Sequence, residues 1–564
     1  MILKALTLEN FKGIRGPVRI EFAPLTLLFG PNSSGKSTIF KALQFTSALL
    51  NAAGGDPFDA SAADGVDLGD FRDVVNDHDV NKPIRMVYEI PLRPVFPNYD
   101  PGGIFPNDRS ERLHELAGLE GPIGGNSRSA TVTLEVRYDP VLGSAYLAQY
   151  QVDIDGIPFG TIRYDTARSQ AAITFVNYCH PVLIEADPQY LYSYESWLKD
   201  AGLSRDEDLS DVCGDNSNTK LEYYISRHNK PPYGNQPFPI ALRNYKGSLG
   251  NVHRALPLDL DKIEANNLEG VTLDYQAACC LLSDGLLSPA WHLAVILEDA
   301  VFLGPLRHIP SREQAEFSAI AKPNLATGEA AWHQIINSSP EFIAKLNLWL
   351  SDSDKLATDY GIEVFRYREV PVTDSTIVRS DEPDRQERSV EKSSFYHIPI
   401  RKRVVLKDIR RGLDLTLRDV GVGLSQLLPI LVESLRDTRG FGYGDLLGIE
   451  QPELHLHPAL QVRLADLFIS ASTGKINRRQ FLVETHSEHL MLRCLRRIRE
   501  NSDGKLTESG TKLDCDNIAV LFVEPTLDGP RIHRIRIDEE GEFMDPWPSG
   551  FFPERMKEIY GDDL

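Results

Sequence analysis

Hydrophobic and polar residues alternate at the start of the chain and then give way to a short, almost entirely apolar run. Residues 25–29 (LTLLF) end at Gly30, as a strand buried on both faces would. Helical periodicity follows from about Lys36. Further on, β-type alternation predicts an antiparallel sheet. Its strands are expected in residues 84–92, 130–138 and 145–164.

The pattern changes in the middle of the chain. Residues 181–299 have a longer, more helical period, which predicts an inserted and mainly helical domain. Ala300–Gly304 then indicates a second buried strand, and helical periodicity returns at 331–356. The charged stretch 374–392 predicts an exposed loop. Together these patterns predict an α/β protein with an antiparallel β subdomain.

Composition narrows the class of protein. The 564 residues are 42% hydrophobic and 25% charged, which is typical of a folded, soluble protein. The net charge of −21 repels polyanions, so any DNA contact has to come from a local basic patch. The six cysteines form no CxxC pair or metal-ligand spacing. Since we find no signal peptide or membrane span, we expect a cytoplasmic protein without a membrane contact.

A glycine-rich loop follows the first buried strand and precedes the helix. Its sequence fits G-x-x-x-x-G-K-[ST], in which backbone N–H groups surround a phosphate and the helix N-terminus adds its positive dipole end. Lys36 would supply a point charge, and the Ser37 hydroxyl would ligate Mg²⁺. The pattern therefore predicts binding of a nucleotide's phosphates with Mg²⁺, and by itself it does not say which nucleotide. The nucleotide-binding residues are Gly30, Pro31, Asn32, Ser33, Ser34, Gly35, Lys36, Ser37 and Thr38.

Three further motifs lie near the C-terminus. Residues 445–450 (DLLGIE) form an apolar strand that ends in the carboxylate of Glu450, as a Mg²⁺-supporting Walker B strand does. Residues 481–487 (FLVETHS) form another strand that ends near His486. Upstream, residues 419–426 (DVGVGLSQ) form a Gly-rich turn that opens an apolar helix. The exposed amides and serine of this turn could bind a phosphate.

The order of phosphate loop, long insert, Gly-Ser turn, IEQPELHLHP and THS resembles the ABC-type ATPases related to SMC, Rad50, RecF and OLD proteins. More narrowly, it is similar to the prokaryotic AAA15/AAA21 ATPases. Residues 304–307 (GPLR) and the opening ENFK also resemble this group, and residues 541–552 resemble a short C-terminal module often attached to it. The resemblance implies an ABC-type P-loop NTPase head split by the insertion.

The resemblance also implies roles for individual residues. Glu450 would support Mg²⁺ together with Ser37, and His486 would sense the γ-phosphate. The Gly-Ser turn would contact the γ-phosphate bound to the opposite subunit, so at least a homodimer, or a higher homo-oligomer, is implied. In that turn the nucleotide-contacting residues would be Gly421, Gly423, Ser425 and Gln426.

One departure from the family bears on the chemistry. Relatives usually place a catalytic Glu directly after the Walker B acid, and here that position holds Gln451. The base is then either missing or supplied by Glu453, and we expect slow hydrolysis of ATP. Sustained heptads are absent, which disfavours a DNA-tethering SMC or Rad50 role.

Other candidates receive simpler interpretations. His455 and His457 lack a third ligand nearby and are interpreted as a structural loop. Trp547 is interpreted as an anchor that docks the C-terminal tail and not as a base-stacking platform. Four basic clusters are candidates for a DNA or partner patch. They are Arg401–Arg403, Arg410–Arg411, Arg478–Arg479 and the helical group Arg493, Arg496, Arg497 and Arg499.

The expected function is a homodimeric ATPase that acts as the sensor or regulatory subunit of a prokaryotic anti-phage defence complex and controls a separate effector, such as a nuclease. The alternatives are a RecF-like DNA repair or recombination ATPase and a nucleotide-gated assembly scaffold. No nuclease motif is found. The expected units are an N-terminal ATPase lobe (1–180), the helical insertion (181–299), a return to the core (300–395), a C-terminal ATPase lobe (396–525) and a C-terminal module (526–564).

Overall fold

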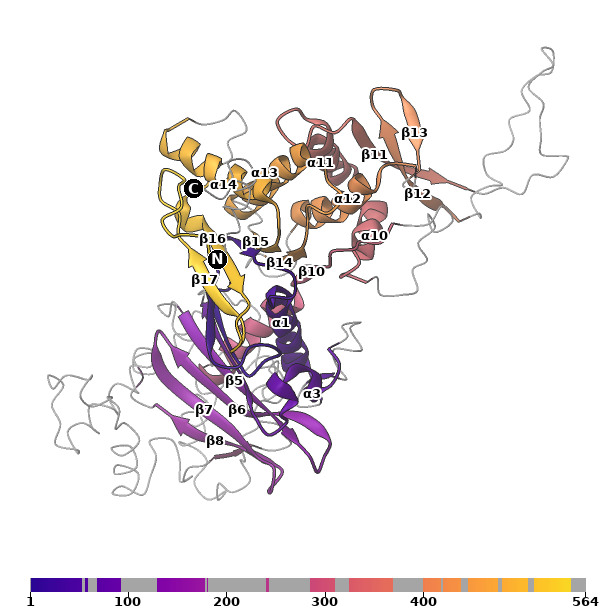
Figure 1. Cartoon of the computed structure of the whole chain (residues 1–564). Coiled ribbons are helices and arrows are strands. Elements are labelled where there is room, and N and C mark those ends of the chain that lie inside the picture. Colours follow the sequence, from indigo (N-terminus) through magenta and orange to yellow (C-terminus); the bar gives the residue numbers. More distant parts are fainter. Residues whose placement is uncertain are drawn as a thin grey trace, which may run out of the picture.

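The computed structural model describes a chain built around three sheets (Figure 1). A six-stranded sheet carries the phosphate loop, an eight-stranded antiparallel sheet lies on one side of it, and a three-stranded sheet lies near α10–α12. The described residues are 2–52, 56–58, 68–92, 129–177, 180, 240–242, 285–309, 324–368, 399–416, 419–437, 445–474, 479–505 and 512–548.

The six-stranded sheet is parallel except for its last strand. Strands β3 and β15 are buried at every residue, because helices or the neighbouring sheet cover both faces. Both the apolar strand before Gly30 and the strand predicted at Ala300–Gly304 are confirmed. In spatial order the strands are β10 (Val301–Leu303), β14 (Asp445–Glu450), β15 (Arg479–Glu484), β3 (Leu25–Phe29), β16 (Ile518–Glu524) and β17 (Arg531–Ile535).

The six-stranded sheet lies between two hydrophobic cores, one on each of its faces. Helix α1 (Lys36–Asn51) lies between the parallel and the antiparallel sheets, where Phe40 and Leu43 pack with residues of both. On the opposite face the sheet packs against a second group of helices. They are α10 (Glu329–Asn337), α12 (Val422–Leu435), α13 (Pro458–Thr473) and α14 (Glu488–Ser502).

The predicted antiparallel sheet is confirmed, with one difference. Residues 145–164 form two strands and not one, because Asp155 and Gly156 adopt positive φ angles of 50° and 83° and reverse the chain. The order is β2 (Val18–Glu21), β1 (Ala5–Glu9), β4 (Ile84–Pro91), β5 (Ser129–Asp139), β6 (Ser144–Ile154), β7 (Ile157–Asp165), β8 (Gln170–Val176) and β9 (Ile240–Leu242).

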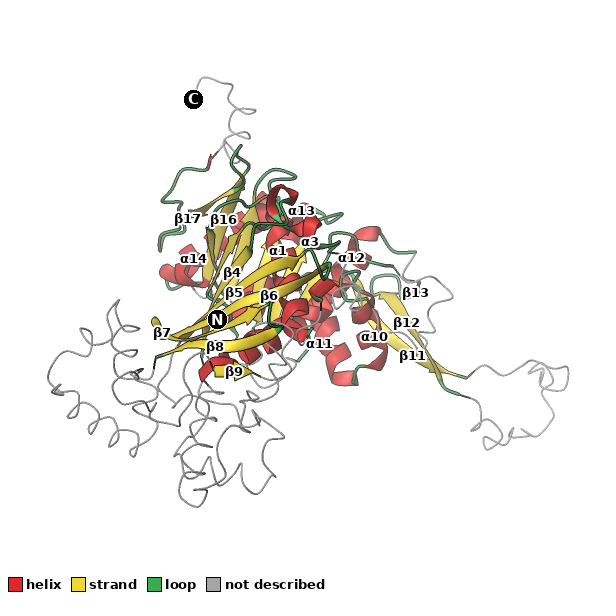
Figure 2. Cartoon of the chain, turned by 90° about the horizontal axis from the view of Figure 1, so that it is seen from below, coloured by secondary structure: helices red, strands yellow, loops and turns green. Residues whose placement is uncertain are grey.

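The helical period predicted at 331–356 corresponds to two helices. Helix α10 ends at Asn337, and α11 (Pro340–Ser351) begins after Ser339, whose side chain accepts a hydrogen bond from the Phe342 N–H. Proline at the first helical position favours this new start. The three-stranded sheet follows (Figure 2). It consists of β11 (Tyr360–Tyr367), β12 (Arg401–Asp408) and β13 (Leu413–Leu415).

Three further described helices are short: α3 (Phe71–Val74), η1 (Asn76–His78) and η5 (Cys515–Asn517). A further helix covers residues 285–298 and packs against the antiparallel sheet. Within the described part of the chain, no helix has the length and apolar character needed to cross a bilayer.

One predicted domain boundary can be compared with the structure. The boundary at 525/526 falls inside the β16–β17 hairpin, so the start of the predicted C-terminal module belongs to the six-stranded sheet. Most of the predicted helical insertion, the predicted loop at 374–392 and Arg478 lie outside the described residues.

Candidate functional site

The phosphate loop connects β3 to α1 in a conformation that requires glycine. Gly30 and Gly35 have φ angles of 142° and 99°. A Cβ atom on Gly30 would lie 2.4 Å from the Val523 carbonyl oxygen of β16. Helix α1 begins after Gly35 without a side-chain cap, so its first N–H groups remain available for an anion.

A carboxylate that the sequence analysis did not assign completes this loop. The Ser37 hydroxyl donates to Glu484 Oε2 at 3.0 Å, and Lys36 Nζ lies 3.7 Å from Glu484 Oε1. Lys36 Nζ also donates to the carbonyl oxygens of Gly30 and Pro31 at 2.9 and 2.8 Å. Burial lowers the pKa of Lys36, while Glu484 opposes that shift. The signal in the sequence was a carboxylate that ends an apolar strand, as at Glu450.

Glu450 and Glu484 end adjacent parallel strands and are direct register partners. Burial, followed by the charge of Glu484, raises the pKa of Glu450 to about 7. Two carboxylates at one strand end disfavour ionisation of both, and a divalent cation would relieve this repulsion. Their position beside the Ser37 hydroxyl fits the Mg²⁺ expected with ATP.

The donor set also fits a nucleotide. Ser34 Oγ is buried and has no hydrogen-bond partner among the described residues, and the open start of α1 supplies N–H groups. Within the described residues, no cluster of three or more His, Cys, Asp or Glu side chains could hold a metal alone. A bound Mg²⁺ would therefore share its ligands with phosphate oxygens and water.

An open cavity of about 420 Å³ lies beside the loop. Gln451 lines it directly after the Walker B carboxylate and has a left-handed backbone with a φ of 44°. Its N–H donates to the Glu484 carbonyl oxygen at 2.8 Å, which holds the chain end of β14 against β15. The other lining residues are Pro31, Asn32, Glu453, Leu454 and His486.

Glu453 and His486 meet at this cavity. Glu453 accepts hydrogen bonds from the Thr485 hydroxyl at 2.8 Å and from the His486 N–H at 2.7 Å, one on each carboxylate oxygen. Burial and then Lys36 lower the pKa of His486, so the imidazole is neutral at pH 7. His486 Nε2 has no hydrogen-bond partner among the described residues. The pair of bonds to Glu453 favours an orienting role for this carboxylate.

Arg307 joins the end of β14 to α12. Its Nη2 donates to the Glu450 carbonyl oxygen at 2.7 Å, while its Nε and Nη1 are buried without partners in the described structure. The Gln426 side chain forms two hydrogen bonds with the Arg307 backbone. Its Oε1 accepts from the Arg307 N–H at 2.9 Å, and its Nε2 donates to the Arg307 carbonyl oxygen at 2.7 Å. Burial lowers the pKa of Arg307 to about 10. In the sequence, residues 304–307 (GPLR) carry a family resemblance but no signal of this contact.

The Gly-Ser turn differs from the prediction. Residues 422–426 lie inside α12, and Ser425 and Gln426 are buried, because the first turn of this helix packs against the loop after β14. A Cβ on Gly423 would lie 2.5 Å from the His455 carbonyl oxygen. In this conformation the Ser425 and Gln426 side chains do not reach the surface, and Gly421 and Val422 are the exposed part of the segment.

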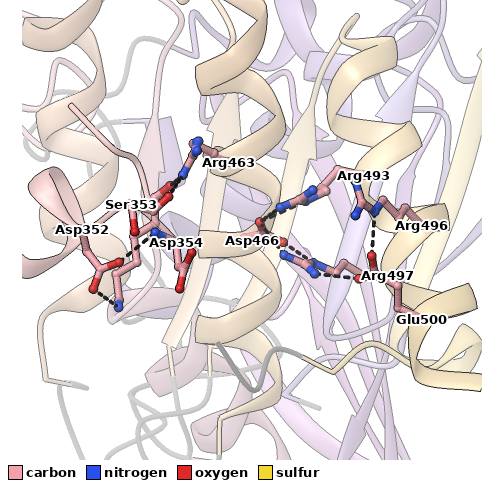
Figure 3. Close-up of polar contacts among 10 residues, drawn as sticks. Asp352, Ser353, Asp354, Arg463, Asp466, Arg493, Arg496, Arg497 and Glu500 are labelled. Carbon is pink, nitrogen blue, oxygen red and sulfur yellow. Dashed lines mark hydrogen bonds and ion pairs between the residues drawn. The ribbon is translucent and has the colours of Figure 1, made fainter. Parts of the chain in front are cut away.

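The helical arginine cluster is not a free basic patch (Figure 3). Arg493 and Arg497 on α14 form ion pairs with Asp466 on α13, and Arg496 and Arg497 pair with Glu500. Arg499 pairs with Glu542. Arg493 and Arg497 are mostly buried against α13, whereas Arg496 and Arg499 are more exposed and pair with Glu500 of the same helix and with Glu542. Three carboxylates thus offset most of the charge of the four arginines within the fold.

Trp547 packs as the docking interpretation expects. Its ring centroid lies 5.5 Å from that of Phe29, 5.9 Å from Phe522 and 5.3 Å from Phe543, in edge-to-face geometry. Because Phe29 ends the strand before the phosphate loop, the tail contacts the sheet directly behind the site. This packing supports the anchor and not the base-stacking platform.

Two segments of the chain match known protein families. Residues 1–96 match the family described as "AAA ATPase domain", and residues 318–492 match "AAA domain, putative AbiEii toxin, Type IV TA system". A comparison with curated proteins gives no match. The phosphate loop and the two family matches make the chain similar to P-loop ATPases. Within that class, it is similar to the AAA15 and AAA21 families.

Solved structures with similarity include three SMC heads. The Smc head bound to the C-terminal winged-helix domain of ScpA is 12% identical, with a TM-score of 0.37, and covers 96% of this chain and 99% of that one. The Smc head with an extended coiled coil from Pyrococcus furiosus is 12% identical, with a TM-score of 0.34 and coverages of 95% and 96%. The SMC head domain from Thermotoga maritima is 12% identical, with a TM-score of 0.34, and the match covers 95% of this chain and 100% of that one.

Proposed function

We propose that the protein binds ATP with Mg²⁺ and hydrolyses it slowly. The arrangement of Lys36, Ser37 and Glu484 at the open start of α1 carries this proposal, because it combines an anion site with a carboxylate beside the Mg²⁺-ligating hydroxyl. Gln451 occupies the place of the usual base, and an amide cannot take a proton from water. Bound Mg²⁺ would supply charge neutralisation at the phosphates.

We assign separate binding roles to the residues of the loop and of the cavity. Lys36 would hold the phosphates, and Glu450 and Glu484 would hold Mg²⁺ through water. His486 would bind the γ-phosphate from the cavity side with its neutral ring, while Glu453 holds the backbone at this position through the His486 N–H. Glu453 could in addition accept a proton from a water in the cavity that it lines.

The first test combines a phosphate-loop variant with a repair of the base. Lys36→Ala should abolish ATP binding and leave the fold intact, as measured with a fluorescent ATP analogue and circular dichroism. Gln451→Glu should raise basal hydrolysis by about tenfold or more, since a positioned base contributes about 10² to 10⁴ in rate. Gln451→Leu is the matched control without a base. Unchanged ATP affinity in Lys36→Ala would refute the proposed site.

We further propose a homodimer in which the N-terminus of α12 contacts the nucleotide of the opposite subunit. The exposed Gly421–Val422 segment supports this contact better than the buried Ser425 does. Val422→Arg should block ATP-dependent dimerisation and retain ATP binding by the monomer. Mixing it with Lys36→Ala protein should restore part of the activity, because one composite site in each heterodimer is intact. No recovery in the mixture would contradict a shared site.

In the cell, we propose that slow turnover makes a long-lived ATP-bound state that controls a separate effector in an anti-phage system. The description of the family matched by residues 318–492, which names a putative toxin of a type IV toxin–antitoxin system, supports a role in genetic conflict. A RecF-like repair ATPase is the alternative. Loss of phage protection in Lys36→Ala cells that keep normal survival after DNA damage would favour defence, and the reverse result would favour repair.

A further inference from the structure

The three-stranded sheet has two edge strands, β11 and β13, and the longer of them, β11, has no strand partner on its outer edge among the described residues. Among the described strands β11 pairs with β12 alone, in the order β11-β12-β13, and its other edge faces α11 (Figure 2). In an antiparallel pair, every second residue turns its N–H and C=O groups away from the partner strand. An exposed row of such groups is a template for another strand.

Asn347 on α11 identifies which residues face outward. Its Nδ2 donates to the Ile362 carbonyl oxygen at 2.9 Å, and the Ile362 N–H donates to Asn347 Oδ1 at 2.6 Å. The two-residue period of a strand places the backbone groups of Val364 and Arg366 on the same edge. No described residue hydrogen-bonds to these two backbones on that side. Two consecutive outward-facing positions are therefore open beyond the one that Asn347 satisfies.

A groove of about 660 Å³ runs along this edge. Pro340, Ile343 and Ala344 of α11 form an apolar wall opposite Val364 and Arg366. Side chains of an added strand would alternate between this wall and solvent. The volume falls within the range of specific binding sites.

Arg366 brings a positive charge to the groove, since the other two charged residues that line it, Glu363 and Lys407, form an ion pair with each other. Arg366 is exposed and has no ion-pair partner among the described residues, and it lies directly opposite Lys402 across the β11–β12 pair. Lys402 Nζ donates only to the Asn337 side-chain oxygen, at 3.0 Å. Like charges directly opposite one another destabilise a sheet, and a bound carboxylate would relieve this repulsion. The protein as a whole is acidic, with a net charge of −21.

We propose that this groove binds an extended, acidic peptide segment of a partner protein, which adds to β11 as a fourth strand. Its backbone bonds to Val364 and Arg366, its alternate apolar side chains pack on α11, and its carboxylates lie near Arg366 and Lys402. This mode of recognition takes affinity from main-chain hydrogen bonds and specificity from the side-chain contacts. The inference goes beyond nucleotide binding and does not depend on it.

The probe is a fluorescein-labelled, acetylated hexapeptide of alternating Val and Glu, measured by fluorescence polarisation on the full chain. It should bind at least about tenfold more tightly than the Val–Lys peptide of the same length, because one strong charge contact contributes about 1.4 kcal/mol or more. N-methylation of the alternate amides that face β11 should weaken binding by about tenfold or more, since it removes main-chain donors. Equal affinity of the methylated peptide would refute strand addition.

Substitutions in the groove provide a second test of the proposal. Val364→Pro removes an outward N–H that β12 does not use, and edge strands tolerate such a proline. This variant should lose peptide binding, whereas the matched control Val364→Thr retains it. Arg366→Glu should reverse the preference from the Val–Glu to the Val–Lys peptide. If Val364→Pro fails to fold, Ala344→Trp, which fills the groove from an exposed helix position, should abolish binding instead.

Two results would overturn the proposal directly. One is the absence of binding by any of the peptides to the wild-type chain, and the other is full displacement of the Val–Glu peptide by oligothymidylate with no effect of Val364→Pro, which indicates a general polyanion site. ATP binding, measured in the same preparations, should be unchanged in every groove variant. Failure of wild-type protein to bind ATP would count against the proposed function and leave the peptide result intact.

Discussion

At the scale of single residues, the site is dominated by carboxylates at neighbouring strand ends. Glu484 contacts both Ser37 and Lys36, and Glu450 lies beside it in register. The phosphates of ATP would bring further negative charge to the same place. Mg²⁺ is therefore expected to decide whether these groups attract or repel the nucleotide.

Glu484→Gln tests that expectation. The amide still accepts the Ser37 hydroxyl but removes one charge, so ATP binding without Mg²⁺ should strengthen, while Mg²⁺-dependent hydrolysis should fall by about 10- to 100-fold. Fluorescent-ATP titrations with Mg²⁺ or with EDTA measure the two effects. Glu363→Gln, on the distant strand β11, is the control. Equal weakening of binding with and without Mg²⁺ would contradict a metal-linked role.

The pKa of Glu450 predicts a pH dependence of stability. Because it is raised from 4.5 to about 7, the native state without Mg²⁺ binds a proton that the unfolded chain releases in this interval. The contribution of Glu450 to stability is thus largest below pH 4.5 and falls as pH rises through 7. Glu450→Gln should gain stability relative to wild type across this interval. Urea unfolding at several pH values, with and without Mg²⁺, measures the difference, which Mg²⁺ should reduce.

The sequence predicted the phosphate loop because every residue it needs is contiguous. Glu484 was not predictable in the same way, since its contact with Ser37 depends on β15 lying next to β3, which no local pattern encodes. The burial of Ser425 was missed for a similar reason. A serine in a Gly-rich turn reads as exposed until the packing of α12 against the loop at His455 is known.

At the scale of elements, Arg307 links the Walker B strand to α12, and its role can be separated from stability. Arg307→Met removes a buried cation whose Nε and Nη1 have no described partner, so the free energy of unfolding should be unchanged or higher. Hydrolysis should nevertheless fall by about tenfold or more, with ATP affinity within about threefold, if the bond to Glu450 positions the loop.

Arg307→Lys is the conservative control and should recover part of the rate, since it restores one charged donor. Chemical denaturation and steady-state kinetics on the same preparations measure stability and the split between kcat and KM. A loss of stability that parallels the loss of rate in both variants would show that Arg307 has only a structural role.

The sequence predicted secondary structure well where periodicity was strong. It did not predict where a helix ends and the next begins, or which tertiary partners the charged side chains have. The run at 331–356 was helical, but the Ser339–Pro340 start signal inside it was overlooked. The arginines on α14 recur at helical spacing, yet two of their partners come from elsewhere, Asp466 from α13 and Glu542 from the C-terminal segment. Charge neutralisation of this kind depends on tertiary neighbours and cannot be read from spacing.

At the scale of the whole molecule, the C-terminal segment belongs to the nucleotide-binding unit. Trp547→Ala should destabilise the fold by about 2 kcal/mol, because it removes an aromatic side chain that packs edge-to-face on three phenylalanines. ATP affinity should fall as well, since Phe29 precedes the phosphate loop. Trp547→Phe should lose less of both. Thermal unfolding with and without ATP measures the change, and unaltered stability in Trp547→Ala would contradict the anchor.

The order of the strands has a consequence for synthesis on the ribosome. Strand β3 emerges early, yet its two neighbours are β15 and β16, so Leu25 pairs with Phe481 on one side and Ile518 on the other. Contacts so distant along the chain slow folding, and they cannot form until the later strands leave the exit tunnel. For most of its translation the nascent chain therefore carries an apolar strand without its sheet. During that interval LTLLF is prone to aggregate unless the early antiparallel sheet or a chaperone covers it.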